Sequence, residues 1–210
     1  STGKMGGRLM VGIGHSGEFP DDQRRDDKLS CTFDTPPLEA ELNVVGQPVA
    51  SLLLSVDQPV ANIAIRLCDL HPTGESTLVT YGVLNLTHRG SNEAPEALVP
   101  GKSYRIKVPL NHIAYRLPRG HQLRLSVSNA YWPLIWPSPY RDTLSLELSG
   151  SHLSLPCSPS IENYINPVLD EFDQEDISTG MELRPAHSKK RSLEDHQTGE
   201  VKIRTRTDDG

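Results

Sequence analysis

Hydrophobic and polar residues alternate with a period of two along much of the first 158 residues. Between 122 and 128, for example, Leu123, Leu125 and Val127 alternate with Gln, Arg and Ser side chains. This alternation is typical of a strand with one face on a core and the other in water. The same pattern, or a short apolar run, predicts nine strands, over 29–33, 40–44, 49–56, 63–67, 77–86, 104–110, 123–127, 144–148 and 152–156.

Turn-forming residues separate the predicted strands. Turn signals that contain Gly, Pro or both lie at 46–48, 57–59, 71–74, 100–101 and 118–120. Because no amphipathic helix intervenes, the pattern predicts an all-β fold, an antiparallel sandwich with jelly-roll or immunoglobulin-like topology. In such a fold the inward positions include Leu42, Ile65, Ile106, Leu125 and Leu146, which we expect to be buried.

The density of charge changes near residue 158. Residues 159–210 carry 19 charged side chains in 52 residues, against 29 in the preceding 158. We therefore expect a sandwich domain over 1–158 and a charged extension over 159–210. In the extension, the sequence predicts a short helix within 161–172, a loop over 173–191 and a hairpin with strands at 192–196 and 200–207. The chain ends on the turn signal Asp208-Asp209-Gly210, so we expect the native protein to continue.

Composition excludes several function classes. The net charge of −6 and the isoelectric point of about 5.7 disfavour a nucleic-acid partner, since no basic face is available for phosphates. No apolar stretch approaches the ~18–20 residues that span a bilayer. The three cysteines, Cys31, Cys68 and Cys157, are too few and too scattered for a disulfide framework. We therefore expect free thiols and a cytoplasmic protein without a membrane contact.

An acidic segment over 21–27 contains four aspartates and two adjacent arginines. Calcium takes several oxygen ligands from loops, so a calcium site is one interpretation. The arginines favour the other interpretation, a local network of ion pairs and hydrogen bonds without metal. We expect Asp22, Arg24, Asp26 and Asp27 to form that network.

Residues 131–140 hold both tryptophans and three prolines. The prolines exclude a central strand or a helix, so a stiff aromatic loop is predicted. One interpretation is a platform on which a sugar or another ligand stacks. The favoured one is a loop whose rings pack on the sandwich or on a neighbouring domain. The residues concerned are Tyr131, Trp132, Trp136 and Tyr140.

No residue pattern predicts catalysis or a cofactor. The glycine pattern over 12–17 is not followed by the helix start that a dinucleotide site requires. Ser16 has Glu18 where a nucleophile elbow needs Gly. The eight histidines are scattered without metal-ligand spacing, and His121 is expected to anchor a loop by a hydrogen bond. We therefore predict no catalytic residue, no metal and no cofactor.

Several stretches together resemble one family. They are Phe19-Pro20-Asp21-Asp22-Gln23-Arg24-Arg25-Asp26-Asp27, the segments 66–76 and 81–89, Pro100-Gly101, Pro118-Arg119-Gly120-His121-Gln122-Leu123-Arg124-Leu125, and Ser128-Asn129-Ala130-Tyr131-Trp132-Pro133. In this order and spacing they resemble the C-terminal domain of the X-Pro dipeptidyl-peptidase and cocaine esterase hydrolases. The resemblance covers roughly residues 6–157, and one departure is Gln122, where the family usually has Arg.

The resemblance implies a jelly-roll domain with a galactose-binding-like fold. In the family this domain packs on an α/β-hydrolase domain that carries the Ser-Asp-His triad, and the enzymes hydrolyse esters and X-Pro amides. It therefore implies a serine hydrolase parent, with the α/β-hydrolase domain of the same polypeptide as the partner. No residue of this chain matches the triad, so the domain itself is expected to be non-catalytic.

The resemblance also implies a role for the stretch over 6–11. In the esterases, the corresponding strand contributes apolar residues to the acyl pocket, which makes Met10 and Val11 the candidates for lining it. The alternative is that both are ordinary core residues of a first strand. We expect the stretch 9–11 and the loop 131–140 to face the partner. If the partner is missing, we expect them to mediate self-association or to be covered by apolar residues of the extension, namely Ile161, Tyr164, Ile165, Val168, Leu169 and Phe172. An alternative function is a carbohydrate-binding module that uses the aromatic loop.

Overall fold

The computed structural model describes residues 2–7, 20, 22–158, 187–194 and 201–208. They fall into two units, and the first contains the described residues up to 158. The second contains a hairpin in which β11 (His187–Glu194) pairs antiparallel with β12 (Val201–Asp208). A hairpin was predicted here, but its first strand begins within the segment predicted as loop. The predicted helix within 161–172 lies outside the described residues.

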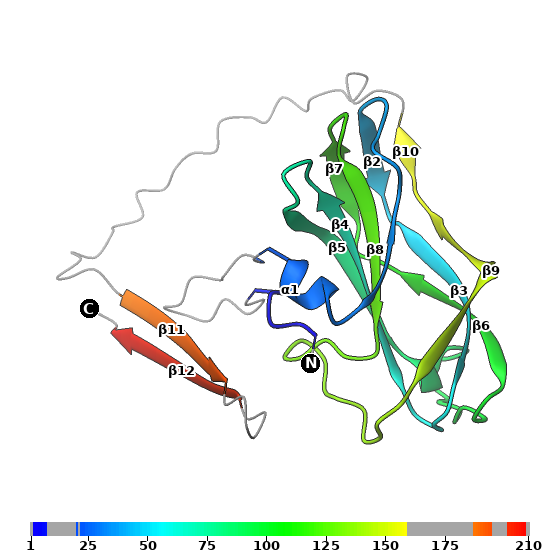
Figure 1. Ribbon diagram of the computed structural model, residues 1–210. Helices are drawn as coiled ribbons and strands as arrows, with labels where there is room; N and C mark the ends of the chain where they lie inside the picture. The colour runs from blue at the N-terminus through cyan, green and yellow to red at the C-terminus, as the bar shows by residue number, and fades with distance from the viewer. Residues whose placement is uncertain (1, 8–19, 21, 159–186, 195–200, 209–210) are drawn as a thin grey trace, which may run out of the picture. The chain divides into compact units, whose positions relative to one another are not determined.

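Three antiparallel sheets build the first unit (Figure 1). The four-stranded sheet has the order β1-β8-β4-β5, with β1 (Cys31–Asp34), β8 (Gln122–Ser128), β4 (Asn62–Leu70) and β5 (Ser76–Asn85). Two three-stranded sheets have the orders β6-β3-β9 and β10-β2-β7. Their strands are β6 (Ser103–Pro109), β3 (Val49–Val56), β9 (Leu144–Ser154), β10 (Cys157–Ser158), β2 (Leu42–Gly46) and β7 (Ile113–Leu117). A 3₁₀ turn, η1 (Leu86–His88), follows β5.

One apolar cluster joins the sheets. It combines side chains of β4 and β8 with side chains of β2, β3, β6 and β7, as expected for sheets that face each other across a core. Figure 1 shows β4, β5 and β8 on one side of this core and β3, β6 and β9 on the other. The prediction of an all-β antiparallel sandwich is therefore confirmed, whereas the jelly-roll and galactose-binding-like topology remains a prediction.

The core differs in part from the predicted one. Ile65 and Ile106 are buried as expected. Leu42, Leu125 and Leu146 are only partly buried and pack against the cluster. Leu125 and Leu146 line a groove, so each side chain lacks packing neighbours on one side. Period-two alternation identifies the inward face of a strand but not how completely the opposite sheet covers it.

Three strands differ from the expected ones. β7 was not predicted, although Ile113, Tyr115 and Leu117 alternate with polar or small residues. The two-residue β10 was also missed. The strands expected at 144–148 and 152–156 are one strand, β9, whose register against β3 shifts between Ser51 and Leu53. Gly150 lies at this irregularity, where a Cβ atom would come within 2.8 Å of the Leu53 side chain.

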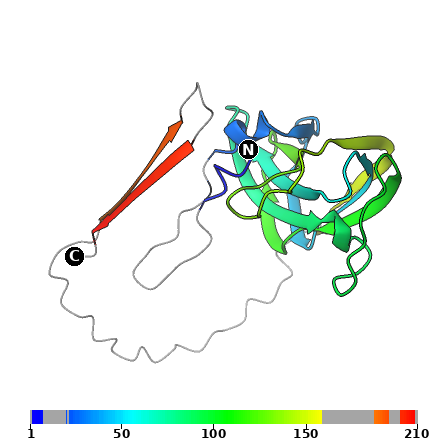
Figure 2. The same cartoon turned by 90° about the horizontal axis from the view of Figure 1, so that it is seen from below.

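The strand β4 departs most from expectation because both of its faces are buried. Alternation predicted that Ala64, Arg66 and Cys68 would face water, yet each is at most 1% exposed. The short helix α1 (Arg24–Asp27) and the N-terminal residues cover this outer face. Figure 2 shows α1 and the N-terminus together on the outside of the sandwich. The sheet therefore separates an apolar core from a second, polar layer. Among the described residues, neither helix is long and apolar enough to cross a membrane.

Candidate functional site

The aromatic loop exposes three of its four large rings. Trp136 is 80% exposed, Tyr140 47% and Trp132 38%. Tyr131 does not belong to this surface, contrary to the prediction, because it is only 2% exposed and packs against Tyr81. Burial raises the pKa of Tyr131 to about 12. The partner-facing candidates are thereby reduced to Trp132, Trp136 and Tyr140.

Backbone contacts hold this loop in one shape. The Trp132–Pro133 peptide bond is cis, and the amide of Ile135 donates to the carbonyl of Tyr131. The Asn62 side chain donates to the carbonyl of Trp136 at 3.0 Å. The two indole rings meet edge to face, with centroids 5.4 Å apart and planes at 74°. The exposed rings therefore project from a fixed loop.

The N-terminal residues lie against the same loop and against α1. The amides of Gly3 and Met5 donate to Oδ2 of Asp26 at 2.9 and 3.1 Å, and Trp132 donates to the carbonyl of Thr2. Gly3 has a φ of +108°, and a Cβ there would lie 2.3 Å from the carbonyl oxygen of Trp132. This close approach requires glycine. The arrangement fixes the start of the stretch that leads to Met10 and Val11, which themselves lie outside the described residues.

Asp27 is the centre of a buried network of hydrogen bonds and ion pairs. Oδ1 accepts from Ser126 at 2.8 Å and lies 3.0 Å from a guanidinium nitrogen of Arg66. Oδ2 accepts from Ser76 at 2.8 Å and from Arg124 at 3.1 Å. The Asp27 and Arg66 side chains are 4% and 1% exposed. A buried charge pair is tolerated when further hydrogen bonds satisfy both groups, as they do here.

Arg66 extends the network to α1. It donates to Oε1 of Gln23 and to the hydroxyl of Ser30, both at 2.9 Å. Gln23 in turn donates to the carbonyl of Met5 at 2.7 Å. Strands β4, β5 and β8, helix α1 and the N-terminal residues are thus joined through polar side chains. The network is not the local one that the sequence suggested, since the arginines that reach Asp27 come from distant strands.

The remaining pair of the acidic segment lies at the surface. Arg24 donates to Oδ2 of Asp22 at 2.7 Å, and this hydrogen bond holds the pKa of Asp22 below its usual value. Asp22 also accepts from the amide of Ser76. Arg124, which contacts Asp27, makes a bidentate pair with Asp34 through two contacts of 2.7 Å, and this pair raises the pKa of Arg124. The described carboxylates of residues 22–27 are therefore engaged by protein groups.

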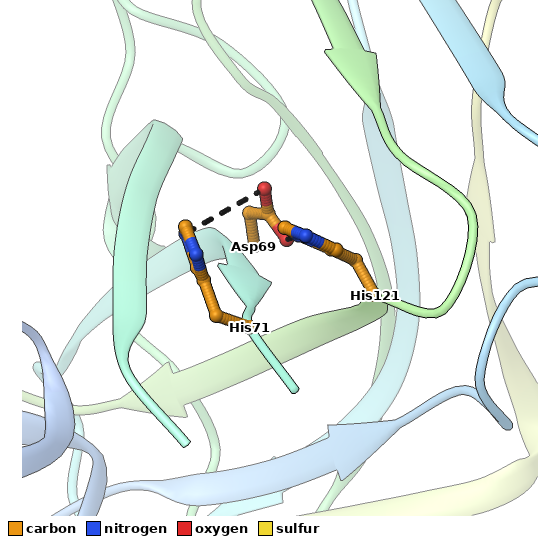
Figure 3. A group of neighbouring side chains, drawn as sticks. All are labelled: Asp69, His71 and His121. Atoms are coloured by element: carbon orange, nitrogen blue, oxygen red, sulfur yellow. Dashed lines mark hydrogen bonds and ion pairs between the residues drawn. The ribbon is translucent and has the colours of Figure 1, made fainter. Parts of the chain in front are cut away.

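A second polar cluster lies where β4 ends and β8 begins (Figure 3). Nδ1 of His121 lies 2.8 Å from Oδ1 of Asp69, and Nε2 of His71 lies 3.9 Å from Oδ2. The hydroxyl of Tyr115 donates to Oδ2 of Asp69 at 2.9 Å, and burial, together with this hydrogen bond, raises the pKa of Tyr115 to about 12. The imidazole rings of His71 and His121 lie 4.7 Å apart. His121 thus bonds to a carboxylate, in keeping with its predicted role as an anchor.

This cluster was not predicted, although the sequence contains a signal for it. Asp69 and His71 are two residues apart and so point to the same face of an extended chain. The register of β4 and β8 pairs Leu70 with Gln122, which places His121 opposite His71. The strand pairing that brings the histidines together is a long-range feature, and no local spacing reveals it.

Two apolar grooves lie along the edge strands β1 and β9. One has a volume of about 430 Å³, and its lining includes Leu29, Phe33 and Leu148. The other, of about 330 Å³, is lined by Leu125 and Leu146 among others. Leu29 and Leu148 are 58% and 62% exposed. Contiguous exposed apolar surface of this kind marks interaction sites in many proteins.

Comparison with known families assigns the sandwich. Residues 8–166 match the family described as the X-Pro dipeptidyl-peptidase C-terminal non-catalytic domain. The chain belongs to this family. The assignment agrees with the resemblance carried by the segments between 19 and 133, and the match spans more than half of the chain.

Similar proteins are several times longer than the matched region. A Mycobacterium bovis protein named as a candidate serine esterase is 28% identical over 140 residues, which cover 59% of this chain and 22% of that protein. The Xaa-Pro dipeptidyl-peptidase of Lacticaseibacillus casei is 24% identical over 156 residues, covering 58% and 20%. A solved alpha-amino acid ester hydrolase has a similar fold, with a TM-score of 0.63 and 22% identity over 66% of this chain and 27% of that one. The chain thus spans about a fifth of the length of its curated relatives.

Proposed function

We propose that this domain serves as a non-catalytic accessory domain of a serine hydrolase that acts on esters or X-Pro peptides. It braces the α/β-hydrolase domain of the same polypeptide and helps to line its substrate pocket. The family assignment and the names of the longer relatives support a hydrolase parent. The observation that carries the docking role is the exposure of Trp132 and Trp136 on a loop held by hydrogen bonds from Ile135 and Asn62.

A fixed, exposed pair of indole rings is suited to a protein interface. Tryptophan is enriched among the residues that dominate binding energy, because one ring buries a large area. A loop that is already ordered loses little conformational entropy on docking. Trp136 has most of its surface available, and Trp132 supports it edge-on. We assign these two residues to the contact with the hydrolase domain.

Pocket lining is the second part of the proposal. Thr2 contacts the aromatic loop, and Gly3 and Met5 are tied to Asp26, so the N-terminal residues lie beside the proposed docking loop. In the proposal, Met10 and Val11 line the acyl or dipeptidyl pocket of the partner domain. A bulkier residue at position 11 should narrow this pocket for large acyl groups.

The test uses the parent polypeptide with Trp132 and Trp136 both changed to Ala. We expect kcat/KM for X-Pro anilides and for aryl esters to fall about tenfold or more, since loss of bracing misplaces groups in the active site. The matched control is Val99→Ala, because Val99 is exposed at 57% but lies outside the loop. Unchanged activity and unchanged thermal unfolding of the double variant would contradict docking through this loop.

Pocket lining has its own readout. Val11→Phe should change the preference between small and bulky acyl groups while leaving the melting temperature unchanged. If Val11→Phe and Met10→Ala leave the selectivity between acyl groups unchanged, the lining role is wrong even where docking holds.

The alternative function is carbohydrate binding by the same loop. The exposed face of Trp136 would stack on a sugar ring, but the 74° angle to Trp132 leaves no shared flat platform. Titration with oligosaccharides, followed by tryptophan fluorescence, separates the two functions. Saturable quenching that Trp136→Ala abolishes would favour carbohydrate binding over docking.

A further inference from the structure

We propose that Asp69, His71 and His121 form a binding site for a divalent transition-metal cation of intermediate hardness. Zinc and cobalt are the test cases. The site lies apart from the aromatic loop and is independent of the proposed docking function. Among the described residues, this is the one group of three or more His, Cys, Asp or Glu side chains with ligand atoms in mutual reach, all within 4.8 Å. Figure 3 shows the three side chains turned toward one another.

The donor set fits such a cation in type and spacing. Two imidazole nitrogens and one carboxylate oxygen are ligands that zinc, cobalt, nickel and copper accept. Tetrahedral ligands at ~2.0–2.1 Å from an ion lie about 3.3 Å from each other. Nδ1 of His121 lies 2.8 Å from Oδ1 of Asp69, and Nε2 of His71 lies 3.9 Å from the other oxygen, Oδ2. One ligand atom of each residue lies within 4.8 Å of the other two, so rotation of the Asp69 carboxylate and of the His71 ring would bring two nitrogens and one oxygen onto one ion.

The protein already orients the ligands. Asp69 is 2% exposed in its side chain, and Tyr115 donates a hydrogen bond to its Oδ2. Hydrogen bonds of this kind fix the carboxylate ligands of metal sites. Gly120, with a φ of +84°, allows the tight turn that delivers His121 to the start of β8. The backbone of His71 is fixed by hydrogen bonds with Glu75 and Gly74.

The site is closed on one side and accessible on the other. The side chain of His121 is 16% exposed and that of His71 is 32% exposed, so an ion can enter past His71 and keep water ligands there. Without the ion, Nδ1–H of His121 donates to Oδ1 of Asp69, and Nε2 of His71 lies 3.0 Å from the Thr77 hydroxyl. On binding, the ion replaces that hydrogen, which moves to Nε2 in the neutral tautomer of His121. The contact of His71 with Thr77 is exchanged for a bond to the metal.

The experiment measures binding of Co²⁺ and Zn²⁺ to the 210-residue chain. A background with Cys31→Ser and Cys157→Ser removes the two exposed thiols, which would otherwise bind these ions. We expect one equivalent of Co²⁺ to bind with a visible ligand-field spectrum, Zn²⁺ to displace it, and Zn²⁺ to raise the melting temperature. Mg²⁺ and Ca²⁺ should neither displace Co²⁺ nor raise the melting temperature, because they prefer oxygen ligands.

Variants locate the ion. His71→Ala and His121→Ala should each raise the Kd for Co²⁺ at least tenfold, and Tyr115→Phe should raise it about tenfold through the orientation of Asp69. His152→Ala is the matched control, since His152 is exposed on β9 away from the cluster, and its Kd should not change. Since His71 is the most exposed of the three ligands, His71→Ala is expected to fold. Absence of stoichiometric binding, or a Kd unaffected by both cluster variants, would overturn the proposal.

Discussion

On strand β4, Ile63, Ile65 and Leu67 face the apolar core, whereas Arg66 and Cys68 face a layer of polar groups on the other side of the same sheet. Both faces exclude water, but they use different chemistry. The inner face depends on apolar area and close packing. The outer face depends on a carboxylate and a guanidinium that satisfy each other. A strand with period-two alternation can therefore be buried on both sides, with one side polar.

The two faces also differ in what they position. The apolar core holds the sheets together, and most of its members lie within regular strands. The polar layer joins α1, the N-terminal residues and three strands through side chains. The layer therefore positions the N-terminal residues, and these contact the aromatic loop where the amide of Trp132 donates to the carbonyl of Thr2.

The largest expected effect is the loss of Asp27. Asp27→Ala removes the buried partner of Arg66 and leaves that guanidinium uncompensated, which costs about 3–5 kcal/mol in typical cases. Denaturant unfolding monitored by circular dichroism measures the change. Asp22→Ala is the control, because Asp22 makes its ion pair at the surface and its loss should leave the midpoint nearly unchanged. Equal midpoints for the two variants would show that the polar layer carries no stability.

Truncation of a core side chain measures how much the inner face contributes to the free energy of unfolding. Leu67 is fully buried, so Leu67→Ala should cost about 2–5 kcal/mol through lost transfer energy and a residual cavity. Leu125→Ala should cost less, because Leu125 is only partly buried beside a groove. Unfolding free energies for the pair test this order. If Leu125→Ala is the more destabilising change, the groove is closed in solution.

Alkaline pH should lower the stability of the sandwich through two buried groups, Cys68 and Tyr131. Burial raises the pKa of Cys68 and of Tyr131 to about 12. The native state therefore keeps protons that the unfolded chain releases near pH 9–10. It follows that the free energy of unfolding is highest below about pH 9 and falls as pH rises toward 12. Denaturant midpoints at pH 8, 10 and 11 measure this fall, and a constant midpoint would contradict the burial of both groups.

The same burial predicts how the thiols react. Cys31 and Cys157 are exposed and Cys68 is buried. At pH 8 an alkylating reagent should modify the first two and spare Cys68 until the chain unfolds, because the thiolate is the reactive form. Mass spectrometry after a short pulse gives the sites. Modification of Cys68 at a similar rate would mean that the outer layer opens readily.

The smallest stability effect is expected on the aromatic loop. Trp136 is 80% exposed, so Trp136→Ala should change the unfolding free energy by less than about 0.5 kcal/mol. Thermal unfolding of the isolated chain measures this change. A clear loss of stability would mean that Trp136 is a structural residue, and the docking role would lose its main support.

Much of the fold followed from local patterns. The alternation in β3, β6 and β8 predicted their positions, because a sandwich buries one face of each strand. The same rule failed on the outer face of β4, where Arg66 was placed in water. What covers Arg66 is a helix of four residues and the N-terminal stretch, which are distant in sequence and have no periodic pattern.

The candidate sites divide in the same way. The exposure of Trp136 and Tyr140 could be anticipated from a loop with three prolines. The burial of Tyr131 could not, because it depends on packing against Tyr81. The Asp69 cluster required the register of β4 against β8. Contacts set by long-range pairing are the part that local residue patterns do not contain.

The most direct test of the account concerns Asp26, which ties the N-terminal residues to the polar layer. Asp26→Ala removes the acceptor for the amides of Gly3 and Met5. Hydrogen exchange of these two amides should accelerate at least tenfold, while the amide of Leu52 in β3 keeps its protection. Asp26→Asn, which retains an acceptor oxygen, should restore part of the protection. If Gly3 and Met5 exchange equally slowly in the wild type and in Asp26→Ala, the polar layer does not position the N-terminal residues.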